Sequence, residues 1–280
     1  MKKYISIKYS IKEENQDLFI GLISDLDFTG IEQNFDILTI NFPAKIYDEK
    51  IAEKLHKLTI NLGFKVKEVN KEIINEENWN SNWESKLEPV IINEDLIITP
   101  TSKADDFSQY KYIIKIDPKM SFGTGYHATT RLAAKLILKS IKPKSKWLDA
   151  GTGTGVLAIL ASLMGASQLE AFDIDSWSVE NTIENLQINN IDNVNVYEAD
   201  LYKIELNKFD GIIANMFSNL LIDNMSKLSD SIPTGGILIC TGILKYDKEK
   251  VLNSALSNNF KLIEELSEDE WIAYKYEKVI

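Results

Sequence analysis

The order of apolar and polar positions divides the chain into two regions with different rhythms. Up to about residue 75, segments that alternate every second position stand beside segments whose apolar residues recur every three to four positions. The pattern predicts a strand over 3–9, a helix over 12–26, a hairpin of two strands over 28–42, a helix over 47–62 and a strand over 64–70. This β-α-β-β-α-β order is typical of a ferredoxin-like α+β domain, a fold that serves many functions.

After a helix that the pattern places at 127–140, short apolar strands alternate with helical segments. Strands are predicted at 146–150, 168–175, 193–200, 209–216 and 235–243. Such alternation predicts an α/β fold, a parallel, doubly wound sheet with helices on both faces. Two last strands, 260–268 and 270–278, are joined by a turn around Asp269, so we expect an antiparallel C-terminal hairpin. The whole would be a Rossmann-like, mostly parallel seven-stranded sheet.

Between these regions lies a segment of mixed character. Trp79 and Trp83 are four residues apart in a predicted short helix, which places them on one helical face. Short strands follow before residue 120. We therefore expect three parts: residues 1–75 as the ferredoxin-like domain, 76–120 as a connector of one helix and short strands, and 121–280 as the α/β domain.

Composition and charge exclude several classes of protein. One cysteine and two histidines allow no disulfide within the chain and leave too few soft ligands for a zinc centre, so no metal is expected. The net charge of −11 argues against a protein that grips nucleic acid by bulk electrostatics, and we expect no sequence-specific nucleic-acid binding. It suits an enzyme for small molecules or for a basic macromolecule.

The acidic excess is concentrated in the second region. Residues 1–75 carry 11 lysines and 12 acidic residues, which leaves nearly all of the net charge to the remainder. The chain shows no apolar run of 18 residues and no signal peptide, so we expect no membrane span and a cytoplasmic location.

A glycine-rich turn follows the first strand of the α/β region, in "WLDAGTGTGVLA". A phosphate-binding P-loop would need a Lys after the glycines, and none is there. A dinucleotide fingerprint would need a glycine where Val156 stands. What remains is an acid, Asp149, followed by Gly-x-Gly-x-Gly at Gly151, Gly153 and Gly155. This is the pattern of S-adenosylmethionine-dependent methyltransferases.

Charge supports the methyl donor over a nicotinamide cofactor. A carboxylate at Asp149 would repel a pyrophosphate but can support an ammonium group or brace the loop. Asp173 ends the next strand, and its carboxylate can accept hydrogen bonds from both ribose hydroxyls. An NAD-dependent oxidoreductase shows the same acid spacing and stays as an alternative. Asp175 is expected to cap the following helix, and Asp200 faces either an adenine amino group or solvent.

Two further polar residues are candidates for the reaction itself. Asn215 ends the strand 209–216, where its amide oxygen can accept a hydrogen bond from an attacking amine and aim the lone pair; the alternative is a cap for the next helix. His127 is a candidate base, but we expect it to brace the loop or helix start, because methyl transfer to an amine needs no strong base.

Together these stretches resemble the ribosomal protein L11 methyltransferase family of the PrmA type, a class I S-adenosylmethionine-dependent family. The resemblance rests on "SFGTGYHATT", "LDAGTGTGVLAI", "FDIDSWSVENTIEN", "IIANM" and "TGIL". It is most specific at Phe-Gly-Thr-Gly-x-His-x-Thr-Thr, residues 122–130, and extends over about 76–277. It implies a class I methyltransferase domain behind a ferredoxin-like domain that recognises the ribosomal protein.

The resemblance also implies a cofactor, a substrate and a set of site residues. The cofactor would be S-adenosylmethionine, and the acceptors would be lysine ε-amines of ribosomal protein L11, free or on the ribosome, with its N-terminal α-amine as a further candidate. Cofactor contacts fall on Thr130, Gly151, Asp173 and Asn215. Further lining residues would be Phe122, Gly123, Thr124, Gly125, Asp149, Gly153 and Gly155. Another protein, an RNA or a small-molecule amine as substrate, and a binding-only scaffold, are the alternatives.

The tripeptide Gly-Thr-Gly occurs at 123–125 and again at 151–153, at the start of the glycine-rich turn. One helix and one strand separate the two copies, which is enough for the chain to leave a site and return to it. We therefore predict that loop 122–130 and turn 151–155 form two walls of one pocket.

Overall fold

A computed structural model describes residues 3–75, 87–103, 106–119 and 121–279. The chain divides into two compact units, Met1–Trp79 and Asn80–Ile280, and each is described by itself. The helix expected to carry Trp79 and Trp83 lies outside the described residues. Across the described ranges, no helix combines the length and apolarity that a bilayer crossing requires.

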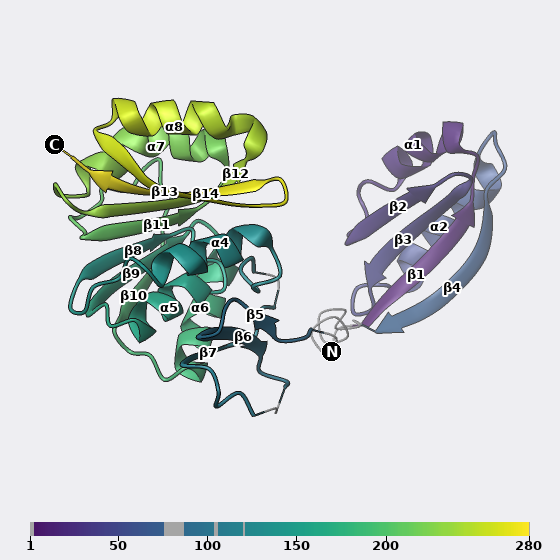
Figure 1. Cartoon of the computed structure of the whole chain (residues 1–280). Helices are drawn as coiled ribbons and strands as arrows, with labels where there is room; N and C mark the ends of the chain where they lie inside the picture. The colour runs from purple at the N-terminus through teal and green to yellow at the C-terminus, as the bar shows by residue number, and fades with distance from the viewer. Residues whose placement is uncertain (1–2, 76–86, 104–105, 120, 280) are drawn as a thin grey trace. The chain divides into compact units, whose positions relative to one another are not determined.

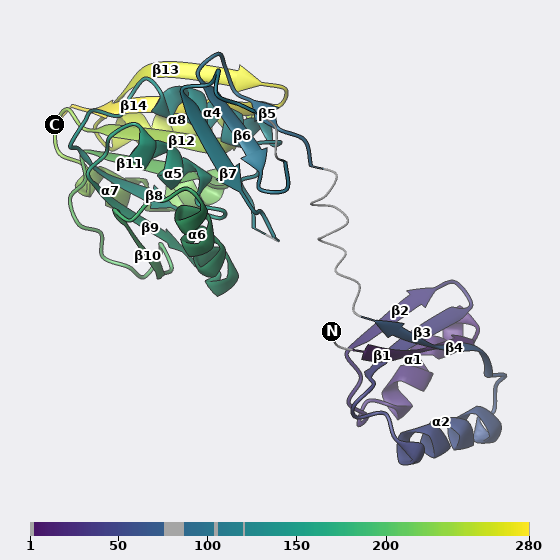
Figure 2. The ribbon, with the colours of Figure 1, turned by 90° about the horizontal axis from the view of Figure 1, so that it is seen from below.

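The first unit is a four-stranded antiparallel sheet with two helices on one of its faces (Figure 2). Its elements are β1 (Lys3–Ser10), α1 (Glu13–Leu22), β2 (Gly30–Asn34), β3 (Ile37–Pro43), α2 (Glu49–Asn61) and β4 (Lys67–Asn75), in the sheet order β2-β3-β1-β4. Alternate apolar residues of the sheet pack against the helices, as Ile7 and Ile40 do in the cluster that contains Phe19 and Leu55. The predicted ferredoxin-like order is confirmed.

The largest differences from the pattern-based element bounds in this unit are at α1 and β4. Helix α1 ends at Leu22, four residues earlier than expected. Strand β4 begins three residues later and continues to Asn75. The strand is longer because β1 offers it a partner along its whole length, from Lys3 opposite Asn75 to Ser10 opposite Lys67. Pairing with a distant segment, which local alternation does not reveal, sets the length of a strand.

The second unit is built on a seven-stranded sheet with the order β10-β9-β8-β11-β12-β14-β13. Its strands are β8 (Lys146–Ala150), β9 (Gln168–Asp173), β10 (Val194–Glu198), β11 (Gly211–Asn215), β12 (Ile237–Leu244), β13 (Phe260–Glu268) and β14 (Trp271–Lys278). The first five in this order pair in parallel, and β14 runs antiparallel to both of its neighbours. The Rossmann-like fold with a C-terminal hairpin is therefore confirmed.

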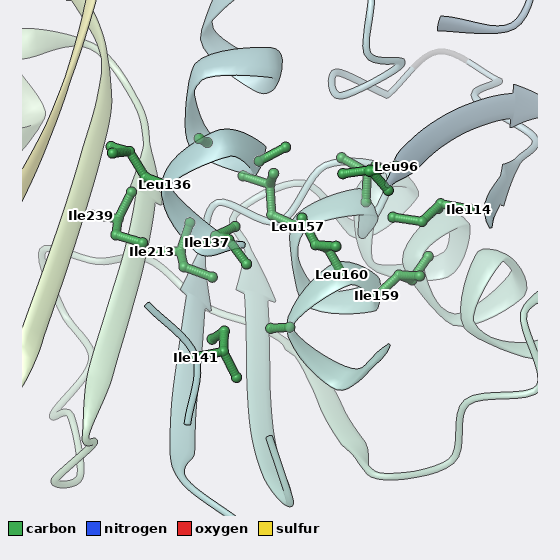
Figure 3. Close-up of a cluster of buried hydrophobic side chains, with 14 of the residues drawn as sticks. Leu96, Ile114, Leu136, Ile137, Ile141, Leu157, Ile159, Leu160, Ile213 and Ile239 are labelled. Carbon is green, nitrogen blue, oxygen red and sulfur yellow. The ribbon is translucent and has the colours of Figure 1, made fainter. Parts of the chain in front are cut away.

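Helices cover both faces of this sheet (Figure 1). One face carries α4 (Ala128–Ile137), α5 (Val156–Leu163) and α6 (Ser176–Ile188), and the other carries α7 (Ser218–Asp230) and α8 (Lys248–Ser257), which follows a short 3-10 helix, η1 (Lys245–Asp247). Two buried apolar clusters fill the two layers. Figure 3 shows Leu136 and Ile137 of α4 beside Ile213 and Ile239 of the sheet.

A small three-stranded sheet belongs to the same unit. It consists of β5 (Val90–Ile91), β6 (Leu96–Pro100) and β7 (Tyr112–Ile116). Its apolar residues join the cluster of α4 and α5, and Figure 3 shows Leu96 and Ile114 on the side of Leu157 and Ile159. The small sheet thereby supports the segment that leads into the first Gly-Thr-Gly stretch.

The strand order fixes where a ligand can enter. From β8 the chain continues to β9 and β10 on one side, and β11 and β12 lie on the other side of β8. The order therefore reverses between β8 and β11. In open parallel sheets such a reversal leaves a crevice at the carboxyl ends of the strands, because the connections leave in opposite directions.

Candidate functional site

A cavity of about 500 Å³ lies at these carboxyl ends. It is built from the segments after five neighbouring strands, the loop before α4, and the start of β14. The lining residues are Phe122, His127, Thr129, Gly151, Gly153, Phe172, Asp173, Ile174, Ser178, Ala199, Asp200, Leu201, Tyr202, Asn215, Met216, Phe217, Leu220, Gly242 and Trp271. Its walls are mainly apolar and aromatic, with a few polar groups, as is usual for a site that binds a small organic molecule.

The glycine turn is fastened to the sheet by its own backbone. The amides of Gly151 and Thr152 both donate to the carbonyl of Phe172, at 2.9 and 3.0 Å. The amide of Gly153 donates to Oδ2 of Asp173 at 3.0 Å. The predicted residues Gly151, Gly153 and Asp173 thus meet in one place and line the cavity together.

Asp149 lies beneath this turn and does not line the cavity. Its Oδ2 accepts hydrogen bonds from the Thr152 hydroxyl at 2.8 Å and the Ala158 amide at 3.1 Å, so it braces the turn and the start of α5. Burial raises the pKa of this carboxyl to about 7. Its Oδ1 is buried and has no hydrogen-bond partner among the described residues. The expectation that Asp149 could brace the loop is confirmed.

The two Gly-Thr-Gly stretches are in direct contact. The Thr154 amide donates to the Phe122 carbonyl, and the Thr154 hydroxyl donates to the Gly123 carbonyl, both at 2.8 Å. A Cβ on Gly153 would lie 2.2 Å from the Phe122 carbonyl oxygen, and Gly153 also has a φ of +58°. Only glycine allows this approach. Phe122 and the turn line one cavity, as predicted for two walls. The expectation that Gly123, Thr124, Gly125 and Gly155 also line it is wrong, because the glycines among them pack against other residues of the chain.

The acidic residues after β9 and β10 have distinct roles. Both oxygens of Asp173 accept backbone amides, from Gly153 and from Asp175, and each carboxylate oxygen can still accept a further donor. Asp175 caps α6, as expected, by accepting from the Trp177 amide. Asp200 lines the cavity, but its oxygens accept the Tyr202 amide and pair with Lys203, and these contacts lower its pKa.

Asn215 ends β11 and lines the cavity. Its side chain makes no hydrogen bond with any other residue that the structure describes. The following helix, α7, begins at Ser218 with Phe217 as its N-cap, so Asn215 does not serve as the helix cap. The side chain is therefore available to a bound molecule.

His127 caps helix α4 and closes one side of the cavity. Its Nδ1 accepts the Thr129 amide at 3.3 Å and lies 2.8 Å from the Thr129 hydroxyl. Its ring stands edge-on to Phe122 and Trp271, with centroid distances of 5.3 and 4.8 Å. Burial, and then the charge of Arg131, lower the pKa of His127. The expectation that His127 braces the loop and helix start is confirmed.

Thr130 occupies a different place from its neighbour. It is fully buried, and its hydroxyl has no hydrogen-bond partner in the described part of the chain. Thr129 lines the cavity, while Thr130 does not.

Several lining residues escaped the sequence-based assignment. Ile174, Leu201, Tyr202 and Phe217 each follow the carboxyl end of a strand, which is the signal that could have found them. Trp271 has no such signal, because it begins the antiparallel strand β14. Only the sheet order brings it back to the cavity.

The charge of the lining restricts the ligand. Among the described lining residues two are carboxylates, Asp173 and Asp200, and none is Lys or Arg. A pyrophosphate would find no cation to balance it, whereas a ligand with a positive charge would be stabilised. This is unfavourable for a dinucleotide and favourable for a sulfonium compound.

Comparison with known proteins gives a consistent result. The sequence model described as ribosomal protein L11 methyltransferase (PrmA) matches residues 5–279. A protein named ribosomal protein L11 methyltransferase from Acetivibrio thermocellus is 36% identical over 200 residues, which are 71% of this chain and span only 64% of that relative's length. One of the same name from Streptococcus pneumoniae is 29% identical over 307 residues, with 99% of this chain and 97% of the relative covered.

Solved structures are similar to this chain as well. The crystal structure of ribosomal protein L11 methylase from Lactobacillus delbrueckii subsp. bulgaricus matches with a TM-score of 0.64 and 27% sequence identity. The match covers 69% of this chain and all of that one. Sequence and fold therefore lead to the same group of proteins.

Proposed function

This chain belongs to the ribosomal protein L11 methyltransferase (PrmA) family, and from this premise we propose that it transfers methyl groups from S-adenosylmethionine to lysine ε-amines of ribosomal protein L11. The N-terminal α-amine of that protein is a second acceptor of the same chemistry. We place the reaction in the cytoplasm. The observation that carries the proposal is the cavity, where a glycine turn, a strand-end carboxylate and an unpaired asparagine meet.

The residues of the cavity fit S-adenosylmethionine. Its lining has two carboxylates and no basic residue, which suits a cationic ligand. Asn215 and Asp173 also line the cavity, and their side-chain oxygens can accept hydrogen bonds from a bound molecule.

We assign the cofactor contacts to this chain's residues as follows. The backbone of the turn at Gly151 and Gly153 approaches the amino-acid part of the cofactor, and Thr129, rather than the expected Thr130, contributes to the same wall. Asp173 accepts the ribose hydroxyls with the acceptor capacity that its two amide contacts leave free. Apolar residues after β10 and β11, such as Leu201 and Leu220, enclose the adenine.

The bound cofactor supplies a methyl group on a sulfonium, with a neutral thioether as leaving group. The chain therefore needs no acid to expel it. A lysine must be neutral to attack, and at pH 7 its ordinary pKa of about 10.4 makes this cost about 4.6 kcal/mol. The apolar lining lowers the pKa of an amine that enters it. Asn215 orients the amine by accepting a hydrogen bond, and such positioning is worth about 7–11 kcal/mol of barrier at most.

We assign recognition of the ribosomal protein to the first unit. All residues of the cavity come from the second unit, so the first is free for another task. Both of its helices lie on one face of its sheet (Figure 2). Cross-linking of the full chain to ribosomal protein L11, followed by mass spectrometry, tests this: cross-links confined to Asn80–Ile280 would contradict the assignment.

The substrate is tested directly with labelled cofactor. The protein is incubated with tritiated S-adenosylmethionine and a ribosomal extract, and the labelled species is identified by mass spectrometry. We expect label on lysines of ribosomal protein L11. Label in RNA or in another protein would overturn the substrate, and binding of NAD in place of S-adenosylmethionine would overturn the chemistry.

The role of Asn215 is tested by Asn215→Ala. Because Asn215 orients the amine, we expect turnover to fall about hundredfold. The affinity for S-adenosylmethionine, measured by isothermal titration calorimetry, should change far less. Asn219→Ala is the matched control, since Asn219 is exposed on α7 and does not line the cavity. Full turnover in the Asn215 variant would remove the assigned role.

A further inference from the structure

Arg131, in the first turn of α4, joins two segments that are far apart in the sequence. Its Nε donates to Oε1 of Glu268 at 2.7 Å, and Nη2 donates to the same oxygen. Its Nη1 donates to the carbonyl of Gly125 at 3.2 Å and to the carbonyl of Tyr126. One guanidinium thus holds the end of the loop before α4 and the last residue of β13. The side chains of Arg131 and Glu268 are only 21% and 28% exposed.

Two partners of Arg131, Tyr126 and Glu268, are each next to an aromatic residue of the cavity wall. His127 directly follows Tyr126, and Trp271 is paired with Glu268 across the β13–β14 turn. The ring centroids of His127 and Trp271 are 4.8 Å apart, and both residues line the cavity. The guanidinium therefore ties together the two backbone segments from which these rings project.

The opposite end of the same loop is held by other contacts. Phe122 and Gly123 accept the amide and the hydroxyl of Thr154. These bonds attach that end to the glycine turn, which is itself fastened to Phe172 and Asp173. Arg131 takes no part in them, so loss of its contacts would leave the turn in place and free only the side of His127 and Trp271.

We infer that Arg131 is a positioning residue that, through Glu268, sets the spacing of His127 and Trp271 and so shapes the cavity wall that these rings form. We assign the lysine to this side because Trp271 pairs with β12, the strand that also pairs with Asn215. The inference rests on the proposed function and deepens it. An arginine suits this task because its planar guanidinium can donate hydrogen bonds to acceptors on two segments at once. The compact ammonium group of a lysine lacks this fixed, planar arrangement of donors. The residue acts through its partners and does not touch the reacting atoms.

The test uses Arg131→Gln, Arg131→Lys, Glu268→Gln and the double variant Arg131→Gln/Glu268→Gln in the full chain. Glu264→Gln is the matched control. Glu264 also lies on β13 and pairs at 2.6 Å with Lys139, just beyond α4, but this pair has no contact with the loop. Circular dichroism establishes that each variant is folded. If Arg131→Gln does not fold, Glu268→Gln carries the same test.

Kinetics distinguish positioning from general support. For Arg131→Gln and Glu268→Gln we expect kcat/KM for ribosomal protein L11 to fall about tenfold, while the dissociation constant of S-adenosylmethionine changes less than about twofold. Arg131→Lys should fall between these variants and the wild type. The double variant should be little worse than the worse single variant, because without Arg131 the Glu268 side chain keeps only its 3.5 Å pair with Lys135, which has no contact with the loop. An equal loss of cofactor affinity, or the same defect in Glu264→Gln, would overturn the inference.

A second measurement is independent of activity. Hydrogen–deuterium exchange without any substrate should be faster at 122–131 and at 266–272 in Arg131→Gln and in Glu268→Gln, but unchanged in Glu264→Gln. Unchanged exchange at either segment would overturn the inference even if the enzyme methylates ribosomal protein L11. If the wild type fails to methylate that protein, the proposed function fails. The exchange result still decides whether Arg131 and Glu268 hold the two segments together.

Discussion

The two Gly-Thr-Gly stretches have the same three residues but are held in place by different kinds of hydrogen bond. The turn at Gly151–Gly153 is held by backbone amides that reach the neighbouring strand β9 and by Asp149 below it. The loop at Gly123–Gly125 is held almost entirely by side chains from elsewhere, from Thr154 at one end and Arg131 at the other.

This difference shows that a tripeptide does not define its own role. The turn is hydrogen-bonded directly to the sheet, at Phe172 and Asp173 of β9. The loop is placed by residues on α4 and on the turn itself, so its position can change without disturbing the strands. We therefore expect substitutions in the turn to be strongly destabilising. Substitutions of Thr154 and Arg131, which hold the loop, should have smaller and graded effects.

Gly153→Ala should give the largest effect, because it attacks the contact between the two stretches. Alanine at a φ of +58° is strained, and its Cβ would meet the Phe122 carbonyl oxygen at 2.2 Å. We expect a loss of about 2–4 kcal/mol in the free energy of unfolding and a fall of at least about tenfold in affinity for S-adenosylmethionine. Chemical unfolding and calorimetry measure the two.

Gly235→Ala is the control for that variant. Gly235 has a φ of +82°, but nothing lies within 4 Å of the Cβ that alanine would add. It should cost only the backbone strain, about 1 kcal/mol. Equal losses in the two variants would mean that the approach of loop and turn adds nothing, and the comparison would fail.

The second prediction concerns pH and the buried carboxyl below the turn. Burial raises the pKa of Asp149 to about 7, above its ordinary value of 3.8. The folded protein therefore holds this proton more tightly than the unfolded chain does. The resulting stabilisation is complete below about pH 4 and is lost as the pH rises through about 7.

Asp149→Asn should remove this dependence, because an amide does not titrate. Between about pH 4 and pH 7 the free energy of unfolding of the wild type should fall, relative to the variant, by on the order of a few kcal/mol. Denaturant unfolding at a series of pH values measures it. Parallel pH profiles for the two proteins would show that the turn is not supported by a buried acid.

The smallest effect is expected from Thr154→Val, which removes the hydroxyl bond from turn to loop. The loss should be about 1 kcal/mol, with no change in its pH dependence. Hydrogen exchange should increase at 122–127. Thr182→Val is the matched control, because the Thr182 hydroxyl donates to Gly153 and holds the turn to α6 instead. Faster loop exchange in both variants would contradict separate support of loop and turn.

Sequence pattern predicted what depends on neighbours along the chain. The strand–turn–helix at Asp149 to Val156 and the strand-end positions of Asp173 and Asn215 follow from local periodicity and lie where expected. Trp271 could not be found this way, because its place depends on strand β14 returning antiparallel beside β12. The length of β4 likewise depends on a strand distant in sequence, its partner β1.

The choice between adjacent threonines was also beyond the pattern. Thr129 and Thr130 are successive residues of α4, so their side chains point in directions about 100° apart. Which of them faces the cavity depends on the rotation of the helix on the sheet. In the structure Thr129 lines the cavity, and the buried hydroxyl of Thr130 has no partner among the described residues.

The hairpin that supplies Trp271 has a consequence for folding during synthesis of the chain. Synthesis proceeds from the N-terminus, so the glycine turn, Asp173 and Asn215 all leave the ribosome before the strand that completes the cavity wall. A nascent chain that stops after β12 would present that strand as an open edge, which invites aggregation. The hairpin therefore completes the cavity wall with Trp271 and pairs the edge of β12 in a single step, after the other lining residues have been synthesised.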